Sequence, residues 1–199
     1  RSVVIPEKLD GHPVREIGDM AFSWRKNLTS VTLLEGLTTI GNSAFYDCGS
    51  LASVTLPEGL TAIEDYAFSS CRRLASITLP DSLSAIGANP FQGLPTQITI
   101  SPDHPHFAVL DGVLYDKADR KLVAYPYASK AESFSVPKGI RSIGNSAFSW
   151  CGSLASVTLP EGLTAIGDRA FSKCDGLASV TIPASVTVIG DDAFYKCPA

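Results

Sequence analysis

Charged side chains are scarce in this sequence. They make up 18% of its 199 residues and leave a net charge of −4 at pH 7, whereas about a quarter of residues are charged in an ordinary globular protein. We therefore expect no basic surface for a nucleic acid. The sequence has no run of about 20 apolar residues, so we expect no membrane insertion by this segment. The hydrophobic fraction of 45% is too high for a disordered chain and predicts a folded protein.

Catalytic motifs are missing as well. The sequence has neither the Gly-x-Ser-x-Gly elbow of a serine hydrolase nor a Gly-rich phosphate loop with its Lys. His104 and His106 stand close to Asp103, but a metal site needs three or four converging ligands. Glutamates recur at one turn position and favour a solvated stripe over an acid/base pair. We therefore expect no enzyme: no catalytic residue, no cofactor and no metal site.

A repeat of 23 residues fills most of the sequence. Residues 51–63 are identical to residues 154–166. Each copy places an Ile five residues before a Phe, and the copies follow one another every 23 residues on both sides of one interruption. The Phe residues are Phe22, Phe45, Phe68, Phe91, Phe148, Phe171 and Phe194. A period of roughly 20 to 29 residues is typical of solenoids built from leucine-rich repeats.

The residues of each copy predict its local structure. In Ser53-Val54-Thr55-Leu56, apolar and hydroxyl side chains alternate, as in a half-buried strand. Pro57 then removes a backbone donor and ends the strand. An Asn or Asp two residues after the repeat Ile stands where a helix N-cap is expected, and the residues that follow it, such as 43–48, predict a short helical segment.

Eight strand-like cores predict eight rungs. Their first inward residues are Val3, Val31, Val54, Ile77, Ile98, Phe134, Val157 and Val180. The fold class is therefore a repeat solenoid of the leucine-rich-repeat type, with eight rungs of about 23 residues. It should carry short parallel strands on one face and turns or short helical segments on the other. Because one rung cannot bury its own apolar face, stacked neighbours should form a continuous core.

An insertion interrupts the repeat. Asp111-Gly112 is a tight-turn signal, and residues 113–115 and 122–125 are rich in strand formers. We expect a β-hairpin-like insertion over residues 101–130, within a single solenoid that spans residues 1–199. It is interpreted as a spacer that changes the curvature. The alternative is a ligand-contact element, since non-repeated segments of solenoids often lie on a binding face.

The five cysteines occupy one column of the repeat. Each lies three residues after the repeat Phe: Cys48, Cys71, Cys151, Cys174 and Cys197. Side chains in one column point the same way, so we expect buried thiols that act as small hydrophobes. A bridge between adjacent rungs and a metal site remain as alternatives.

The pattern Ile-Gly-x-x-Ala-Phe-x-x-Cys-x-x-Leu-x-Ser-Val-Thr-Leu-Pro resembles the BspA-like leucine-rich repeat family. The resemblance covers nearly the whole chain. It implies a bacterial secreted or surface protein, located outside the cell or on its surface, and a non-enzymatic protein-binding module for adhesion to host or other cell-surface proteins. The alternative is a structural spacer or stalk segment of a larger surface protein.

Contacts with a protein partner are expected from aromatic side chains. The outward strand positions carry mostly Ser and Thr and lack the Trp, Tyr and Arg that dominate binding hot spots. The candidate partner contacts are Tyr115, Tyr125, Tyr127, Trp24 and Trp150. The chain starts at Arg1 without Met or leader and has no polar caps, so we expect a piece of a longer protein or end-to-end self-association.

Overall fold

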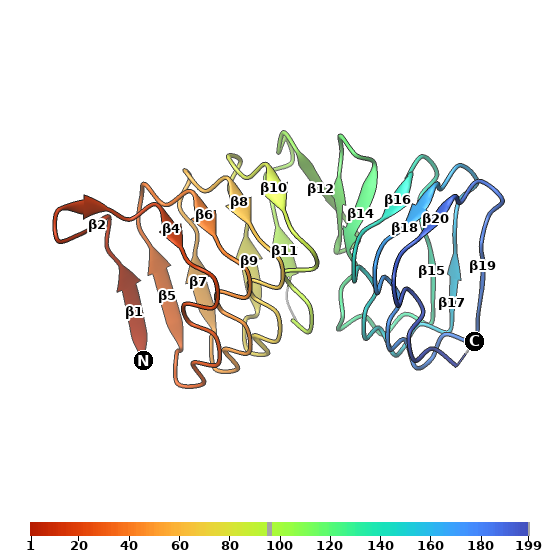
Figure 1. The fold of residues 1–199 in the computed structure, drawn as a ribbon, viewed down its shortest axis with the longest axis horizontal. Coiled ribbons are helices and arrows are strands. Elements are labelled where there is room, and N and C mark those ends of the chain that lie inside the picture. Colours follow the sequence, from red (N-terminus) through yellow and green to blue (C-terminus); the bar gives the residue numbers. More distant parts are fainter. Residues whose placement is uncertain (95–96, 199) are drawn as a thin grey trace. The chain divides into compact units, whose positions relative to one another are not determined.

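The computed structural model describes residues 1–94 and 97–198. They form two compact units, Arg1–Val109 and Leu110–Ala199. In each unit the chain winds in stacked turns that carry short strands on two sides (Figure 1). Strand β12 (Phe107–Leu110) lies at the boundary in the sequence.

Unit 1 contains two parallel series of strands and one small ribbon. The first series is β1 (Ser2–Ile5), β5 (Ser30–Leu33), β7 (Ser53–Thr55), β9 (Ser76–Thr78) and β11 (Gln97–Thr99). The second series is β4 (Glu16–Ile17), β6 (Thr39–Ile40), β8 (Ala62–Ile63) and β10 (Ala85–Ile86). The first turn is five residues longer than the 23-residue repeat. It contains the antiparallel ribbon of β2 (Lys8–Leu9) and β3 (His12–Pro13).

Unit 2 repeats this arrangement. One parallel sheet has the order β15 (Ser133–Ser135), β17 (Ser156–Thr158), β19 (Ser179–Thr181). The other contains, in order, β13 (Val113–Asp116), β14 (Lys121–Ala124), β16 (Ser142–Ile143), β18 (Ala165–Ile166) and β20 (Val188–Ile189). The register follows the repeat, since Val157 pairs with Val180 and Ile143 with Ile166.

The predicted solenoid is confirmed, with a small difference in the number of turns. All eight predicted inward residues lie in strands, five of them in the first series of unit 1 and three in β15, β17 and β19 of unit 2. Among the described residues, only seven turns also contain the second strand that ends at the repeat Ile, because the segment between β11 and β15 has no Ile-Gly pair. The predicted eight rungs therefore become about seven complete turns.

The predicted short helical segments are wrong. Residues 43–47 form consecutive turns. The backbone nitrogens of Ser43 and Phe45 donate to carbonyls of the next turn of the solenoid, at 2.8 and 2.7 Å, whereas Ala44 donates within its own turn to Gly41, at 3.2 Å. An α-helix over these residues would have Asp47 donate to Ser43, but the backbone nitrogen of Asp47 donates to Ser69 of the next turn, at 2.9 Å. Ser43 and Asp47 also have positive φ, 53° and 51°, which interrupts a right-handed helix.

Stacked phenylalanines form the centre of each core. The ring centroids of Phe22 and Phe45 are 5.2 Å apart, and those of Phe45 and Phe68 are also 5.2 Å apart, with nearly parallel planes. In unit 2, Phe148 and Phe171 stack at 4.8 Å. Phe45, Phe68, Phe148 and Phe171 are fully buried. The repeat Phe therefore joins the turns into a continuous apolar core, as the periodicity predicts.

Part of the insertion continues the solenoid of unit 2. Strands β13 and β14 pair antiparallel, and β14 then pairs parallel with β16, with Leu122 opposite Ile143. The backbone nitrogen of Tyr125 donates to the carbonyl of Ala147 at 2.9 Å, the bond that Phe148 makes to Ala170 one turn later. The Tyr125 ring stacks on Phe148 at 4.9 Å. Tyr125 thus occupies the position of a repeat Phe.

The cysteines are free thiols. Four are buried, and Cys197 is partly exposed. The Sγ of Cys71 donates to the carbonyl of Phe45 at 3.1 Å, and that of Cys174 to Phe148 at 3.0 Å. Cys48 and Cys197 make the same bond, to Phe22 and Phe171, both at 3.0 Å. These four thiols therefore hydrogen-bond to the backbone of the preceding turn, which stacking alone does not require.

Candidate partner-binding surface

The outward side of the first strand series is a ladder of small hydroxyls. Ser30 Oγ donates to Ser2 Oγ at 2.8 Å, and the hydroxyl oxygens of Thr78 and Thr99 are 2.8 Å apart. These groups bond to one another along the stack. A flat ladder of this kind offers a partner little apolar area.

Large aromatic side chains are exposed on the turns instead. Trp24 and Trp150 stand two residues after the repeat Phe, with exposed fractions of 56% and 46%. Their backbone nitrogens donate to the next turn, Trp24 to Tyr46 O at 2.7 Å and Trp150 to Ser172 O at 2.9 Å. Both residues have positive φ, 64° and 66°. The backbone is thus fixed by the stack while the indole lies at the surface.

Unit 2 carries the larger group of these side chains. We call Trp150, Lys173, Tyr195 and Lys196 the Trp150 cluster. Lys173 Nζ lies 3.8 Å from the centroid of the Trp150 ring, and Lys196 Nζ lies 5.3 Å from that of Tyr195. The backbone nitrogen of Lys173 donates to Tyr195 O at 2.7 Å, so these residues lie on adjacent turns. Both Lys–ring distances are within the range of a cation–π interaction.

Unit 1 presents a similar but smaller group. The rings of Trp24 and Tyr46 meet edge to face with centroids 5.3 Å apart. Lys26 Nζ lies 6.0 Å from the Trp24 ring, at the outer limit of a cation–π contact. An exposed indole with an aromatic or cationic neighbour is therefore present in both units.

The three tyrosines among the candidate contacts differ in exposure. Tyr127 is 45% exposed, whereas Tyr115 and Tyr125 are buried. The Tyr125 hydroxyl lies 3.0 Å from Ser129 Oγ, and burial raises its pKa. Burial, with a smaller effect of Asp111, raises the pKa of Tyr115 to about 12. The accessible aromatic candidates are therefore Tyr127, Trp24 and Trp150.

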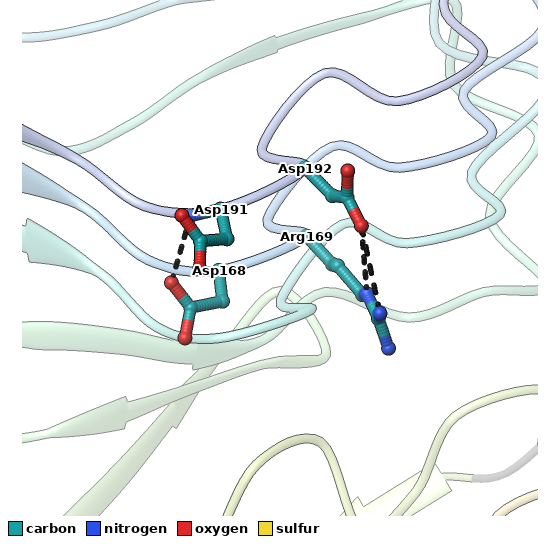
Figure 2. Close-up of polar contacts among 4 residues, drawn as sticks. All are labelled: Asp168, Arg169, Asp191 and Asp192. Carbon is teal, nitrogen blue, oxygen red and sulfur yellow. Dashed lines mark hydrogen bonds and ion pairs between the residues drawn. The ribbon is translucent and has the colours of Figure 1, made fainter.

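The Asn and Asp residues expected to act as N-caps have a different role. Asn145 Oδ1 accepts a hydrogen bond from the backbone nitrogen of Asp168 at 2.9 Å, one turn further on. Asp19 Oδ1 likewise accepts from the backbone nitrogen of Asn42 at 2.7 Å. The N-cap prediction is therefore wrong, since each side chain bonds to the following turn and not to a helix of its own. Beside these hydrogen bonds between turns, Arg169 and Asp192 form an exposed ion pair at 3.4 Å (Figure 2).

The histidine segment is structural in this arrangement. His104 is fully buried, and its Nε2 lies 3.0 Å from Pro80 O. Its Nδ1 accepts hydrogen bonds from the backbone nitrogens of His106 and Phe107, both at 3.2 Å. Within residues 1–94 and 97–198, no group of three or more His, Cys, Asp or Glu side chains converges to hold a metal ion.

Comparison with protein families identifies the repeat. A model of the BspA type leucine rich repeat region matches residues 2–104 and 123–199, with six copies. The chain belongs to this family. The segment outside the match includes β13 and the loop that leads to β14, which is the part of the insertion without the solenoid register. No curated protein matches the chain significantly.

Several solved structures are similar to this chain. The pneumococcal vaccine antigen PcpA has a TM-score of 0.83 and 30% identity, over 94% of this chain and 47% of that one. A leucine rich repeat protein of T. pallidum has a TM-score of 0.52 and 30% identity, over 95% and 72%. A leucine rich cell surface protein from Faecalibacterium prausnitzii A2-165 has a TM-score of 0.51 and 26% identity, over 97% and 72%.

The chain is thus a BspA-type leucine-rich repeat protein, and one of its structural neighbours is a leucine rich cell surface protein. Its fold class is generally non-enzymatic. The chain spans about half the length of PcpA. Among the residues described, no helix is long and apolar enough to cross a bilayer.

Proposed function

We propose that this chain is a non-enzymatic protein-binding module of a bacterial secreted or surface protein, and that it mediates adhesion to host or other cell-surface proteins. The observation that carries the proposal is the Trp150 cluster. Trp150 is nearly half exposed, with Lys173 Nζ 3.8 Å from its ring. Trp and Tyr are the residues most enriched at binding hot spots, because they bring a large rigid area to a contact.

The backbone at Trp150 strengthens this argument. Positive φ favours glycine and costs other residues about 1 kcal/mol. Gly93 occupies the corresponding position of its turn with φ 73°. A tryptophan at such a position gains nothing from local conformation and leaves much of its ring in water. Besides their contacts with Tyr46 and Lys173, Trp24 and Trp150 contribute exposed ring surface, which a partner can cover.

The matched test replaces the tryptophans by glycine. Trp24→Gly with Trp150→Gly removes both indoles and relaxes the backbone, and Ser70→Gly is the control at the same repeat position, where φ is also 64°. Saturable binding to a panel of purified extracellular matrix proteins would be measured by interferometry. We expect the double variant to lose at least about tenfold in affinity for the bound protein and Ser70→Gly to bind as the parent does. Equal binding by the double variant would contradict the proposal.

The second candidate is a structural spacer or stalk. The hydroxyl ladder favours it, because bonds such as Ser30 to Ser2 use the outward groups within the stack. The two candidates differ in one experiment. In the full-length protein, exchanging this chain for an unrelated rigid segment of equal length should leave cell binding intact for a spacer and abolish it for a binding module.

Location and self-association are part of the same proposal. We place the chain outside the cell or on its surface, which antibody labelling of intact bacteria tests. End-to-end self-association is supported by β20, where Val188 and Ile189 are 57% and 52% exposed. A second copy could pair with this edge in parallel. Sedimentation would then depend on protein concentration, and Ile189→Lys should abolish that dependence.

A further inference from the structure

Unit 2 contains a pocket that is separate from the Trp150 cluster. Its volume is about 340 Å³. One wall comes from β13 and the turn between β13 and β14, and the other from residues 137–140, which follow β15. The apolar part of the lining includes Leu110, Pro137 and Ile140. Leu110 is 57% exposed, so a ligand in the pocket would cover apolar area that water now contacts.

The charges around the pocket are mainly positive. Its lining includes Lys117, Arg120 and Lys138, against one carboxylate, Asp116. Asp116 Oδ1 already accepts a hydrogen bond from the backbone nitrogen of Asp119 at 2.9 Å, which holds the hairpin turn. Among the described residues, neither Arg120 nor Lys138 belongs to an ion pair. In a chain of net charge −4, this local excess of cations favours an anion.

Tyr115 supplies a hydrogen-bond donor at the same place. Its side chain lines the pocket and is only 5% exposed. Among the described residues, every side-chain oxygen or nitrogen that is fully enclosed has a hydrogen-bond partner. The Tyr115 hydroxyl has no partner within residues 1–94 and 97–198, so it is not fully enclosed. The hydroxyl is therefore in contact with water, and Tyr115 lines the pocket. A hydroxyl that keeps its proton suits donation to an anion, and burial raises the pKa of Tyr115 to about 12.

We propose that this pocket binds a carboxylate with an apolar stem. The carboxylate accepts from the Tyr115 hydroxyl and lies among Lys117, Arg120 and Lys138, and the stem packs on Leu110, Pro137 and Ile140. This chemistry fits both the carboxyl terminus of a peptide and a small free organic acid. It is independent of the Trp150 cluster, because none of the residues of that cluster lines the pocket.

The test is an NMR titration of the intact chain with phenylacetate, with phenylacetamide as the uncharged match and inorganic phosphate as the anion without a stem. We expect phenylacetate to shift the backbone signals of Lys117, Gly139 and Ile140 with a dissociation constant of about 1 mM, in keeping with its few heavy atoms. Phenylacetamide and phosphate should bind at least about tenfold more weakly. Comparable binding of phenylacetamide, or the absence of saturable shifts in these residues, overturns the proposal.

Variants show which groups hold the anion. Tyr115→Phe should weaken phenylacetate by about tenfold, the usual effect of one hydrogen bond to a charged group, and leave thermal stability unchanged because the hydroxyl has no partner inside the protein. Arg120→Gln with Lys138→Gln should weaken it about fivefold at low salt, and less at high salt. Lys130→Gln, an exposed cation outside the pocket, is the control and should change nothing. Unchanged affinity in Tyr115→Phe contradicts the proposed donor.

The two sources of the carboxylate are separated by a peptide pair. Gly-Gly-Phe with a free carboxyl terminus is compared with its amide under the same conditions. Tighter binding of the free peptide than of phenylacetate assigns the pocket to peptide termini, and weaker binding assigns it to small acids. Equal binding of the free peptide and its amide counts against the carboxylate and overturns the proposal.

Discussion

Asp168 Oδ1 accepts a hydrogen bond from the backbone nitrogen of Asp191, 2.9 Å away and one full repeat later in the sequence (Figure 2). The same relationship links Asn145 to Asp168. The acceptor reaches across the gap between two turns and fixes their register at this point. In each pair, the acceptor oxygen also lies beside the glycine that precedes the donor residue. This glycine is Gly190 beside Asp168 and Gly167 beside Asn145.

The first prediction concerns that glycine. A Cβ on Gly167 would overlap Asn145 Oδ1 and lie 2.7 Å from the Asn145 backbone nitrogen. Gly167→Ala should therefore lower the free energy of unfolding by about 1–3 kcal/mol. Gly18 stands at the same repeat position in the first turn, with nothing within 4 Å of its Cβ. Gly18→Ala should be neutral or slightly stabilising. Urea denaturation measures both, and similar losses in the two variants would contradict the steric argument.

The second prediction compares the hydrogen bond from Asp191 to Asp168 with the neighbouring ion pair of Arg169 and Asp192. Asp168→Ala removes the acceptor of the Asp191 nitrogen and should cost about 1 kcal/mol, whereas Asp168→Asn keeps an acceptor oxygen and should cost less. Arg169→Gln removes an ion pair whose side chains are 62% and 48% exposed. Such pairs contribute little in water. The melting temperature of Arg169→Gln should stay at the parent value. A decrease as large as that of Asp168→Ala would contradict the prediction that the ion pair contributes less than the hydrogen bond.

The third prediction concerns the tyrosine at a Phe position. Tyr125 packs on Phe134 and Phe148, with centroid distances of 4.9 Å to each. Tyr125→Ala should destabilise unit 2 by about 3–5 kcal/mol, as expected for loss of a buried aromatic. Tyr125→Phe keeps the ring and loses only the contact with Ser129, so it should cost about 1 kcal/mol. Hydrogen exchange of residues 142–148 reports the effect. Equal exchange in the two variants would show that the ring does not join the core.

The fourth prediction is a loss of stability at alkaline pH. Burial raises the pKa of Cys174 from 9.0 to about 12 and also raises that of Cys151. A folded pKa above the unfolded one stabilises the protein below pH 9, and this contribution is lost as the pH rises from 9 towards 12. The free energy of unfolding should therefore fall across this window. In Cys174→Ala the fall should be shallower by up to about 1.4 kcal/mol per pH unit. An identical slope would contradict the shift.

The fifth prediction concerns His104, which joins three backbone groups. Its Nδ1 accepts from His106 and Phe107, and its Nε2 donates to Pro80 O in the tautomer that this pattern requires. His104→Ala leaves these buried groups without the ring and should cost about 2–4 kcal/mol. His12→Ala removes an exposed histidine and is the control. Metal addition should not change the melting temperature of the parent chain, and a clear rise would revive the metal hypothesis.

The sequence by itself determined the solenoid. A period of 23 residues, alternation in segments such as Ser53-Val54-Thr55, and a Phe in every copy are enough to place the strands and the core. These signals are reliable because they concern which side chains avoid water, and the repetition tests each of them several times. The same reasoning named Trp24 and Trp150 as aromatic residues outside the core columns, but it also named Tyr115 and Tyr125, which are buried.

The tertiary structure decided where the polar groups find their partners. Local rules assign Asp168 to a helix cap, but the nitrogen that it binds belongs to Asp191, 23 residues away. Each repeat Phe lies five residues after its Ile, but Tyr125 lies only three residues after Leu122. The spacing therefore does not align Tyr125 with the repeat Phe residues, and only the pairing of β14 with β16 reveals its position. The pocket around Tyr115 likewise combines segments about 20 residues apart. Hydrophobic burial follows from composition and period, whereas hydrogen bonds between turns depend on the exact register that stacking creates.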